Sequence, residues 1–277
     1  MNFVKMHGLG NDFILADEFK AQTGLDYAEA ARKLCDRRRG IGGDGLLLLL
    51  PAQDAEARMR VFNADGSEAE MCGNGVRCLA KYVYDAGYVT SEAFTIQTEA
   101  GIKNVWLSAD GGSGREIRVN MGIPLLRPDW IPALARQETA VQEKIEMDGH
   151  SFIFTAVSIG NPHCVIFTPA IEEIRLTEVG PALERHPLFP ARTNVEFAQV
   201  VNRREIILRV WERGAGATQA CGTGACAAVV AGVLEGRLER EALVLLPGGA
   251  LRVNWQDSGP LLMSGPAAYA FRGETLQ

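Results

Sequence analysis

Along most of this chain, apolar residues either alternate with polar ones or run together for about five positions. Both patterns are typical of β-strands with one or both faces buried. In the first half they predict strands at residues 2–6, 13–17, 46–50, 58–62, 94–98, 102–107 and 116–121. In the second half they predict strands at residues 152–157, 164–168, 194–199, 205–211, 242–246, 251–255, 261–264 and 268–271.

Helical spacing occurs in fewer places. Residues 27–38, closed by Gly40, and roughly 177–185 fit surface helices. From Val76 to Tyr84 apolar residues recur at helical spacing, whereas residues 225–234 are small and apolar on every face, which predicts a helix buried all round. We therefore expect an α+β fold with two lobes, each a curved antiparallel or mixed sheet, or an open barrel, wrapped around a central helix.

One short string occurs twice. Cys72-Gly73-Asn74-Gly75 returns as Cys221-Gly222-Thr223-Gly224, 149 positions later. Gly10-Asn11 likewise returns as Gly160-Asn161, and Phe62-Asn63 precedes the first cysteine as Trp211-Glu212 precedes the second. Several landmarks related by nearly one spacing predict an internally duplicated domain.

Composition limits the class of protein. The 277 residues are 47% hydrophobic and 22% charged, with a net charge of −6, which argues against a surface for nucleic acid or an anionic membrane. The longest apolar run, Leu46 to Leu50, is too short to cross a bilayer, and the first residues lack a signal-peptide pattern. We expect a cytoplasmic protein with neither nucleic-acid nor membrane partners, and with its six cysteines reduced.

The cysteines do not have the spacing of a metal site. Cys72 and Cys78 would lie about 240° apart around a helix, and Cys221 and Cys226 about 140° apart, so neither pair shares a face. Structural disulfides do not suit a reducing compartment. Core packing is the interpretation for four cysteines: Cys35, Cys78, Cys164 and Cys226.

Cys72 and Cys221 stand apart because each precedes Gly-x-Gly at the start of a predicted helix. Free N–H groups and the positive end of the helix dipole favour a thiolate there, and a thiol of moderately lowered pKa is a competent base near neutral pH. The same N–H groups can hold a carboxylate. Two Gly-rich turns with small buried residues are the alternative, which the duplication weakens.

Polar residues near the two cysteines complete a set with both donors and acceptors. Each asparagine, taken singly, fits a turn or a cap, and His163 fits a hydrogen-bonded core histidine. Together the set suits an amino acid that carries ammonium and carboxylate groups. Its members are Asn11, Asn63, Asn161, Asn194, Glu212 and Arg213.

With these residues assembled, the chain resembles the diaminopimelate epimerases over nearly its whole length. The resemblance rests on residues 6–13 (MHGLGNDF), 62–67 (FNADGS), 71–78 (MCGNGVRC), 160–163 (GNPH), 192–197 (RTNVEF) and 212–224 (ERGAGATQACGTG). Gly45 is a departure, because some family members carry Gln at this position.

The resemblance implies two pseudo-symmetric lobes with the active site in the cleft between them. The first lobe would be residues 1–120, rejoined by 266–277, and the second 121–265. The implied reaction interconverts LL- and meso-diaminopimelate, a small amino-acid substrate, on the route to lysine and peptidoglycan, without pyridoxal phosphate, metal or other cofactor. The family is often dimeric, so a homodimer is also an expectation.

The resemblance also implies roles for individual residues. Cys72 and Cys221 would be the acid–base pair that moves the proton at the α-carbon, and His163 and Glu212 would tune these thiols. The implied substrate-binding residues are Asn11, Asn63, Gly73, Asn74, Asn161, Asn194, Glu212, Arg213, Gly222 and Thr223.

Two other functions stay open at this point. Another cofactor-independent racemase or epimerase, such as the proline racemase type, would use the same thiol pair, although Arg213 and the asparagines favour a substrate with a second polar end. A thiol redox protein is the alternative from a different class, and it would be expected to carry C-x-x-C, which this sequence lacks.

Overall fold

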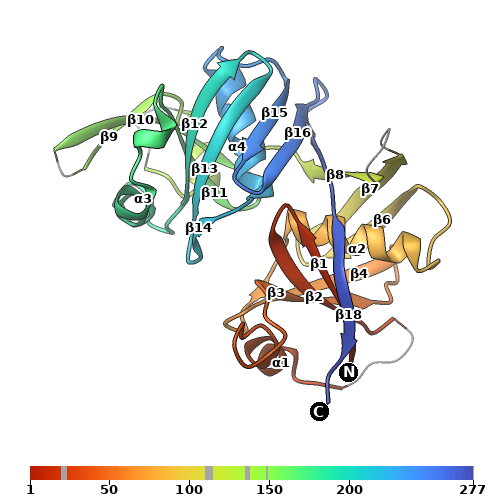
Figure 1. Cartoon of the computed structure of the whole chain (residues 1–277). Coiled ribbons are helices and arrows are strands. Elements are labelled where there is room, and N and C mark those ends of the chain that lie inside the picture. The colour runs from red at the N-terminus through yellow and green to blue at the C-terminus, as the bar shows by residue number, and fades with distance from the viewer. Residues whose placement is uncertain (20–23, 110–114, 135–137, 148, 277) are drawn as a thin grey trace. The chain divides into compact units, whose positions relative to one another are not determined.

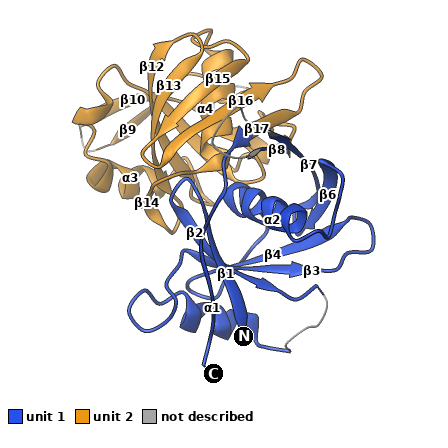
Figure 2. Cartoon of the chain, turned by 45° about the vertical axis from the view of Figure 1, so that its right-hand side comes forward, with its two compact units in different colours: residues 1–120, 264–277 blue, residues 121–263 orange. Residues whose placement is uncertain are grey.

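The computed structural model of the chain describes residues 1–19, 24–109, 115–134, 138–147 and 149–276. The chain divides into two compact units, Met1–Asn120 with Ser264–Gln277, and Met121–Met263 (Figure 2). Each unit consists mainly of strands and contains one 13-residue helix, α2 or α4 (Figure 1).

The first unit takes its last strand from the end of the chain. Its helices are α1 (Tyr27–Leu34) and α2 (Gly73–Asp85). Its strands are β1 (Asn2–Gly8), β2 (Asn11–Asp17), β3 (Gly45–Leu50), β4 (Ala57–Asn63), β5 (Glu68–Ala69), β6 (Ala93–Thr98), β7 (Gly101–Ala109), β8 (Arg115–Gly122) and β18 (Ala268–Glu274). Strand β2 pairs in parallel with β3, and β4 with β6, whereas β18–β1, β1–β2, β3–β4, β4–β5, β6–β7 and β7–β8 are antiparallel.

The second unit is continuous in sequence. Its helices are α3 (Leu176–Glu184) and α4 (Gly222–Leu234), with 3-10 turns η1 (Pro128–Trp130) and η2 (Ile171–Glu173). Its strands are β9 (Glu143–Met147), β10 (His150–Ser158), β11 (Pro162–Phe167), β12 (Asn194–Asn202), β13 (Glu205–Glu212), β14 (Gly216–Thr218), β15 (Glu241–Leu246), β16 (Gly249–Trp255) and β17 (Leu261–Gly265).

The strand pairings of the second unit repeat those of the first. The parallel pairs are β11–β12 and β13–β15, and the antiparallel pairs are β9–β10, β10–β11, β12–β13, β13–β14 and β15–β16. Strands β9 to β16 therefore correspond in order to β18, β1, β2, β3, β4, β5, β6 and β7. The predicted α+β fold with two duplicated lobes is confirmed by this topology.

A central helix packs on one face of each sheet. Helix α4 contacts β10, β11, β12, β13, β15 and β16, so the sheet must curve around it. Its Ala, Gly and Val side chains permit that closeness, and residues Gly224 to Gly232 are buried, as the sequence predicted. In the first unit α2 contacts β1 to β4, and α1 covers β3 and β4. Strand β3 is buried throughout because helices contact both faces, which explains its run of leucines.

The structure corrects several predicted boundaries. Helix α1 ends at Leu34 rather than residue 38, because the Asp36 carboxylate accepts the N–H groups of Arg38 and Arg39 and so forms a turn. The N–H groups of Ile41 and Gly42 then return to the Leu34 carbonyl. Strands β5, β9 and β14 were not predicted, since they are two to five residues long and largely polar or exposed.

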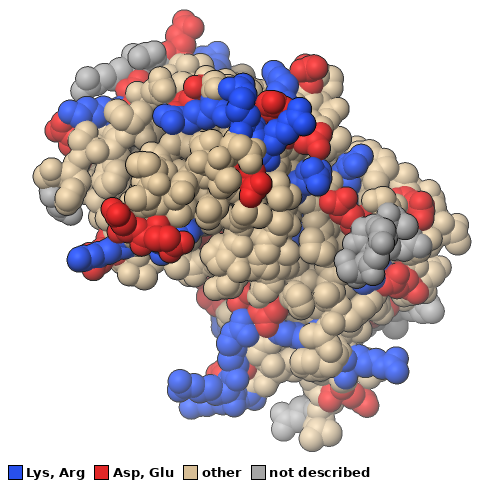
Figure 3. Space-filling model, turned by 45° about the horizontal axis from the view of Figure 1, so that its top comes forward, with Lys and Arg blue, Asp and Glu red and all other residues tan. Residues whose placement is uncertain are grey.

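None of the helices in the described ranges combines the length and apolar character needed to span a membrane. On the face shown in Figure 3, lysine and arginine side chains are interspersed with aspartate and glutamate among uncharged residues.

Candidate active site

Each motif cysteine is the N-cap residue of a central helix, as predicted. Cys72 has an extended backbone, and its Sγ accepts the Gly75 N–H at 3.4 Å at the start of α2. Cys221 does the same for α4, with its Sγ accepting the Gly224 N–H at 3.3 Å. Serine, threonine, aspartate and asparagine are the preferred caps. A thiol at both equivalent positions therefore points to chemistry rather than to capping.

The first unit brings three predicted residues together, which we call the first half-site: Cys72, Asn11 and Asn74. Asn11 begins β2 and Asn74 is the second residue of α2. The Asn74 side-chain amide donates to Asn11 Oδ1 at 3.0 Å, and Cys72 Sγ lies 3.9 Å from the same oxygen. The contact of β2 with α2 thus places the Asn11 amide beside the thiol and the Asn74 amide next to Asn11.

Asn63, at the end of β4, engages its own turn. Its side-chain Nδ2 donates to Ser67 Oγ at 3.0 Å, and its backbone N–H donates to the Ser67 carbonyl. Among the described residues no hydrogen bond joins Asn63 to Cys72 or Asn11. In the structure Asn63 therefore stabilises a turn, and its substrate-binding role stays a prediction.

The second half-site consists of Cys221, Thr223, Asn161 and His163. Thr223 Oγ1 lies 3.5 Å from Cys221 Sγ and 3.3 Å from Asn161 Nδ2. His163 Nε2 lies 2.9 Å from Asn161 Oδ1. Asn161 therefore links the thiol end of α4 to β11, as Asn11 links α2 to β2.

Asn194, Arg213 and Glu212 lie at the strand ends beside this half-site. Asn194 Nδ2 donates to the Pro162 carbonyl at 2.8 Å, and its Oδ1 accepts the Arg213 N–H at 2.9 Å. Glu212 Oε1 accepts the Thr218 hydroxyl at 2.6 Å across the β13–β14 hairpin. The hydrogen bonds of Asn194 thus join the start of β12 to β11 and to the loop after β13.

The electrostatics of Cys221 differ from the prediction. Burial, followed by the carboxylates of Glu212 and Glu196, raises the pKa of the Cys221 thiol well above its ordinary value. The Thr223 hydroxyl and the Gly224 N–H act in the opposite direction but do not prevail. The helix terminus alone would favour a thiolate, whereas this buried position favours the protonated thiol.

Glu196 belongs to this site but was missed. It lies on β12 two residues after Asn194, and its Oε1 is 2.7 Å from His163 Nδ1, with both side chains fully buried. Burial raises the pKa of Glu196, although His163 opposes this. Glu196 Oε2 is buried without a hydrogen-bond partner among the described residues. The sequence did contain a signal for Glu196, because it is an acidic residue inside the otherwise apolar run from Val195 to Ala198.

Asp44 and Arg77 were also missed. Asn11 Nδ2 donates to Asp44 Oδ2 at 2.8 Å. Arg77 is fully buried in α2 and donates from Nη2 to Asn74 Oδ1 at 2.7 Å. An arginine on the buried face of an amphipathic helix was a signal for a role in the interior.

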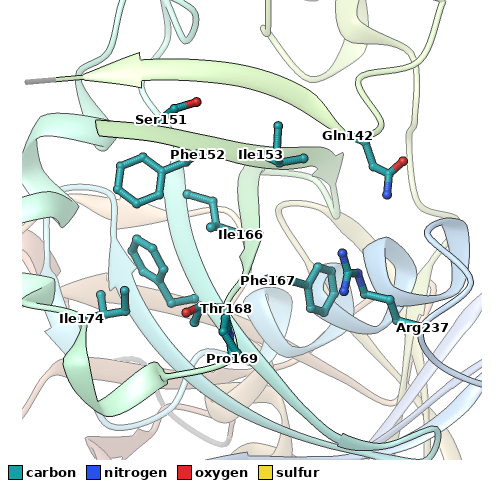
Figure 4. A pocket seen from close by; sticks show the side chains of 11 residues that line it. Gln142, Ser151, Phe152, Ile153, Ile166, Phe167, Thr168, Pro169, Ile174 and Arg237 are labelled. Atoms are coloured by element: carbon teal, nitrogen blue, oxygen red, sulfur yellow. The ribbon is translucent and has the colours of Figure 1, made fainter. Parts of the chain in front are cut away.

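A hollow of about 610 Å³ in the second unit lies away from this chemistry. Strands β10, β11 and β12 contribute most of its apolar lining, including Phe152 and Ile166, and the Arg237 guanidinium lies 4.9 Å from the centre of the Phe167 ring (Figure 4). None of the predicted site residues lines it.

Two solved structures share this fold at low sequence identity. A hydroxyproline epimerase from Agrobacterium vitis superposes with a TM-score of 0.74 at 16% identity, covering 99% of this chain and 91% of that one. A phenazine biosynthesis protein of the PhzF family from Bacillus anthracis has a TM-score of 0.73 at 15% identity, covering 100% and 99%. At such identities the likeness concerns the fold alone.

Sequence comparison is more specific. The family model for diaminopimelate epimerase matches residues 3–126 and 155–270. The diaminopimelate epimerase of Desulfitobacterium hafniense is 52% identical over 279 residues, covering 100% of this chain and 99% of that protein. The one from Moorella thermoacetica is 50% identical over 275 residues, covering 99% of each. The family match and these full-length identities show that the chain belongs to the diaminopimelate epimerase family.

Proposed function

We propose that this chain is a diaminopimelate epimerase that inverts one α-carbon by proton transfer between Cys72 and Cys221. The observation that carries the proposal is the pair of thiols at topologically equivalent helix N-termini. The sulfur of each accepts a hydrogen bond from the N–H of the third residue of its helix. The names of the full-length relatives supply the substrate.

Inversion requires that a proton leaves one face of the carbon and that another arrives on the opposite face. Two groups on opposite sides do this without turning the substrate, provided that each comes within about 3.5 Å of the carbon. In this scheme one sulfur is a thiolate base and the other a thiol acid, and the bound isomer decides which is which. The raised pKa of Cys221 suits an acid that keeps its proton until the carbanion forms.

The carbanion that develops beside the α-carboxylate needs electrostatic stabilisation. The first N–H groups of a helix have no intrahelical partners and carry the positive end of the dipole. Gly75 and Gly224 direct their N–H groups to sulfur. In the proposal, the earlier N–H groups of Gly73 and Asn74, and of Gly222 and Thr223, hold the carboxylate.

The remaining roles follow the predicted set. Asn11, Asn63, Asn161 and Asn194 contact the polar groups of the substrate, and Glu212 with Arg213 offers one charge of each sign. His163 and Glu212 tune the thiols. The scheme includes no cofactor or metal, and a cytoplasmic location, a homodimer, and the absence of nucleic-acid and membrane partners remain parts of the same proposal.

Exchange of the substrate α-proton with solvent tests this directly. The protein is incubated with LL- or meso-diaminopimelate in D₂O, and loss of the α-proton signal is followed by NMR, with L-proline and trans-4-hydroxy-L-proline as competing candidates. Cys72→Ala and Cys221→Ala should each lower epimerisation by about 10²–10⁴-fold, the usual contribution of a general acid or base.

Cys226→Ala is the matched control, because Cys226 lies on the same helix as Cys221 but is buried in the core. It should remain near the wild-type rate. Near-wild-type turnover in both directions by either active-site variant would reject the two-thiol scheme. Exchange with the proline substrates but not with diaminopimelate would instead favour the proline racemase type.

A further inference from the structure

Four side chains of the first unit form a continuous chain of hydrogen bonds beside Cys72. The Arg77 guanidinium donates to Asn74 Oδ1 at 2.7 Å, and Asn74 Nδ2 donates to Asn11 Oδ1 at 3.0 Å. Asn11 Nδ2 then donates to Asp44 Oδ2 at 2.8 Å. We call this series the amide relay: Arg77, Asn74, Asn11 and Asp44.

The two ends of the amide relay fix its direction. A guanidinium can only donate hydrogen bonds and a carboxylate can only accept them, whereas a side-chain amide has one end of each kind. Turning the Asn11 amide would set two donors against each other at Asn74 and two acceptors against each other at Asp44. Turning the Asn74 amide as well would only move the conflict between donors to Arg77. A single orientation of both amides satisfies all three contacts.

Each end is itself held in place. The fully buried Arg77 also donates to the Pro266 carbonyl at 3.2 Å and to the Gly73 carbonyl at 3.4 Å. Gly8 packs so closely that an added Cβ would lie 3.0 Å from Arg77 Nη2.

At the other end, Asp44 Oδ1 accepts from Arg37 at 2.7 Å, and Arg37 also binds Asp12. Lys5 Nζ lies 2.7 Å from Asp12. Although burial alone would raise it, hydrogen bonds from Arg37 and Lys5 hold the pKa of Asp12 well below its ordinary value, so Asp12 stays charged at neutral pH.

The duplicated half shows that this device is specific to the first half-site. The position 149 residues after Arg77 is Cys226, which cannot act as a cation. There the amide of Asn161 lies between His163 and the Thr223 hydroxyl, and both of these can donate or accept. The partners of Asn161 therefore do not impose a single orientation on it.

We propose that Arg77 and Asp44 are positioning residues, which fix the two asparagine amides so that Asn11 Oδ1 faces Cys72 Sγ. This inference rests on the proposed function, because its consequence is a fixed acceptor next to the thiol where the substrate binds. Orienting these amides in advance removes an ordering cost from substrate binding and proton transfer.

Asp44 gives the sharper test because its side chain is 43% exposed, so that its loss does not leave a buried charge unpaired. Asp44→Ala removes the acceptor of Asn11 Nδ2, and kcat/KM should fall by about 10–100-fold, the range for a lost hydrogen bond to a charged group. Asp44→Asn should restore most of the activity, since its side-chain carbonyl oxygen can still accept a hydrogen bond from Asn11, and Arg37 can still bind Asp12.

Asp85→Ala is the matched control. Asp85 is at the opposite end of α2, where it pairs with Lys81 at 3.0 Å and accepts the Tyr269 hydroxyl at 3.0 Å. It should leave kcat/KM within about twofold of wild type. Equal activity of Asp44→Ala and Asp85→Ala, or failure of Asp44→Asn to recover activity in a folded protein, would overturn the positioning role.

A readout independent of turnover separates this inference from the proposed function. Side-chain amide signals of ¹⁵N-asparagine-labelled protein report directly on Asn11 and Asn74, with Asn11→Ala and Asn74→Ala used for assignment. Asp44→Ala and Arg77→Lys should shift or broaden these two signals, and Asp85→Ala should not. If the two signals do not change in these variants, the relay is rejected even when the enzyme is active. If the signals change in the variants but the wild-type protein does not exchange the substrate α-proton, only the proposed function is rejected.

Discussion

Replacing Gly224 by alanine should destabilise the protein much more than the same replacement at Gly75, although both glycines are the third residue of their helix. A Cβ at Gly75 would meet the end of the Leu47 side chain at 3.0 Å and Cys72 Sγ at 3.7 Å. A Cβ at Gly224 would lie 2.8 Å from Glu196 Oε1 and 3.2 Å from Cys221 Sγ.

The surroundings determine the cost. Leu47 ends in a flexible apolar group that can shift, so overpacking there should roughly cancel the helix-propensity gain of up to about 1 kcal/mol from Gly to Ala. Glu196 is fully buried and held by His163 at 2.7 Å, so it can move only by losing that contact. Losing a charge-assisted hydrogen bond costs about 1.5–3 kcal/mol and overpacking about 1–3 kcal/mol, which leaves a net loss of about 1.5–5 kcal/mol after a propensity gain of about 1 kcal/mol.

Urea unfolding followed by circular dichroism measures both variants against wild type. The free energy of unfolding of Gly224→Ala should lie at least about 1.5 kcal/mol below that of Gly75→Ala. Its α-proton exchange should also suffer more, because the added methyl group displaces Cys221 Sγ. If the two variants lose equal free energy of unfolding to within about 0.5 kcal/mol, the usual range for neutral substitutions, the argument that the Glu196 side chain cannot move aside is refuted.

Two further predictions concern the thiols. After burial, the Glu212 carboxylate contributes most to the raised pKa of Cys221. Glu212→Gln removes this charge, so iodoacetamide at pH 8 should alkylate Cys221 faster than in wild type while Cys72 is unaffected, as measured by peptide mass spectrometry. An unchanged rate would contradict the assigned cause. Burial raises the pKa of Cys35 to about 11 and that of Cys78 to about 12. Because the unfolded chain releases these protons first, from about pH 8.5 upward, the urea midpoint should fall as pH rises from 8.5 through 11, and Cys35→Ala should make that fall shallower. A Cys35→Ala slope identical to wild type would argue against this linkage.

Sequence patterns predicted those features that depend on neighbours along the chain. Alternation located most of the strands, and the small residues of 225–234 predicted a helix buried on all sides. The positions of Cys72 and Cys221 at helix N-termini followed from the Gly-x-Gly strings. Very short strands such as β5 and β14 were missed because two or three residues cannot show a period.

The contacts that complete the site join segments far apart in sequence. Asp44 reaches Asn11 across 33 positions, and His163 reaches Glu196 across the same separation. No local pattern reports such pairings. The raised pKa of Cys221 escaped prediction for the same reason, since it follows from burial and from carboxylates on β12 and β13 rather than from the helix that the cysteine caps.

The pairing of β18 with β1 has a consequence for synthesis of the chain. Strand β1 is made first, but one of its edges receives a partner only when residues 268–274 emerge. Until then the nascent first unit has an unpaired strand edge, which is a template for association with other chains. The second unit, whose residues are contiguous, can fold on the ribosome while the first still waits. Loss of the codons for β18 would therefore harm the unit whose other strands are translated before the second unit.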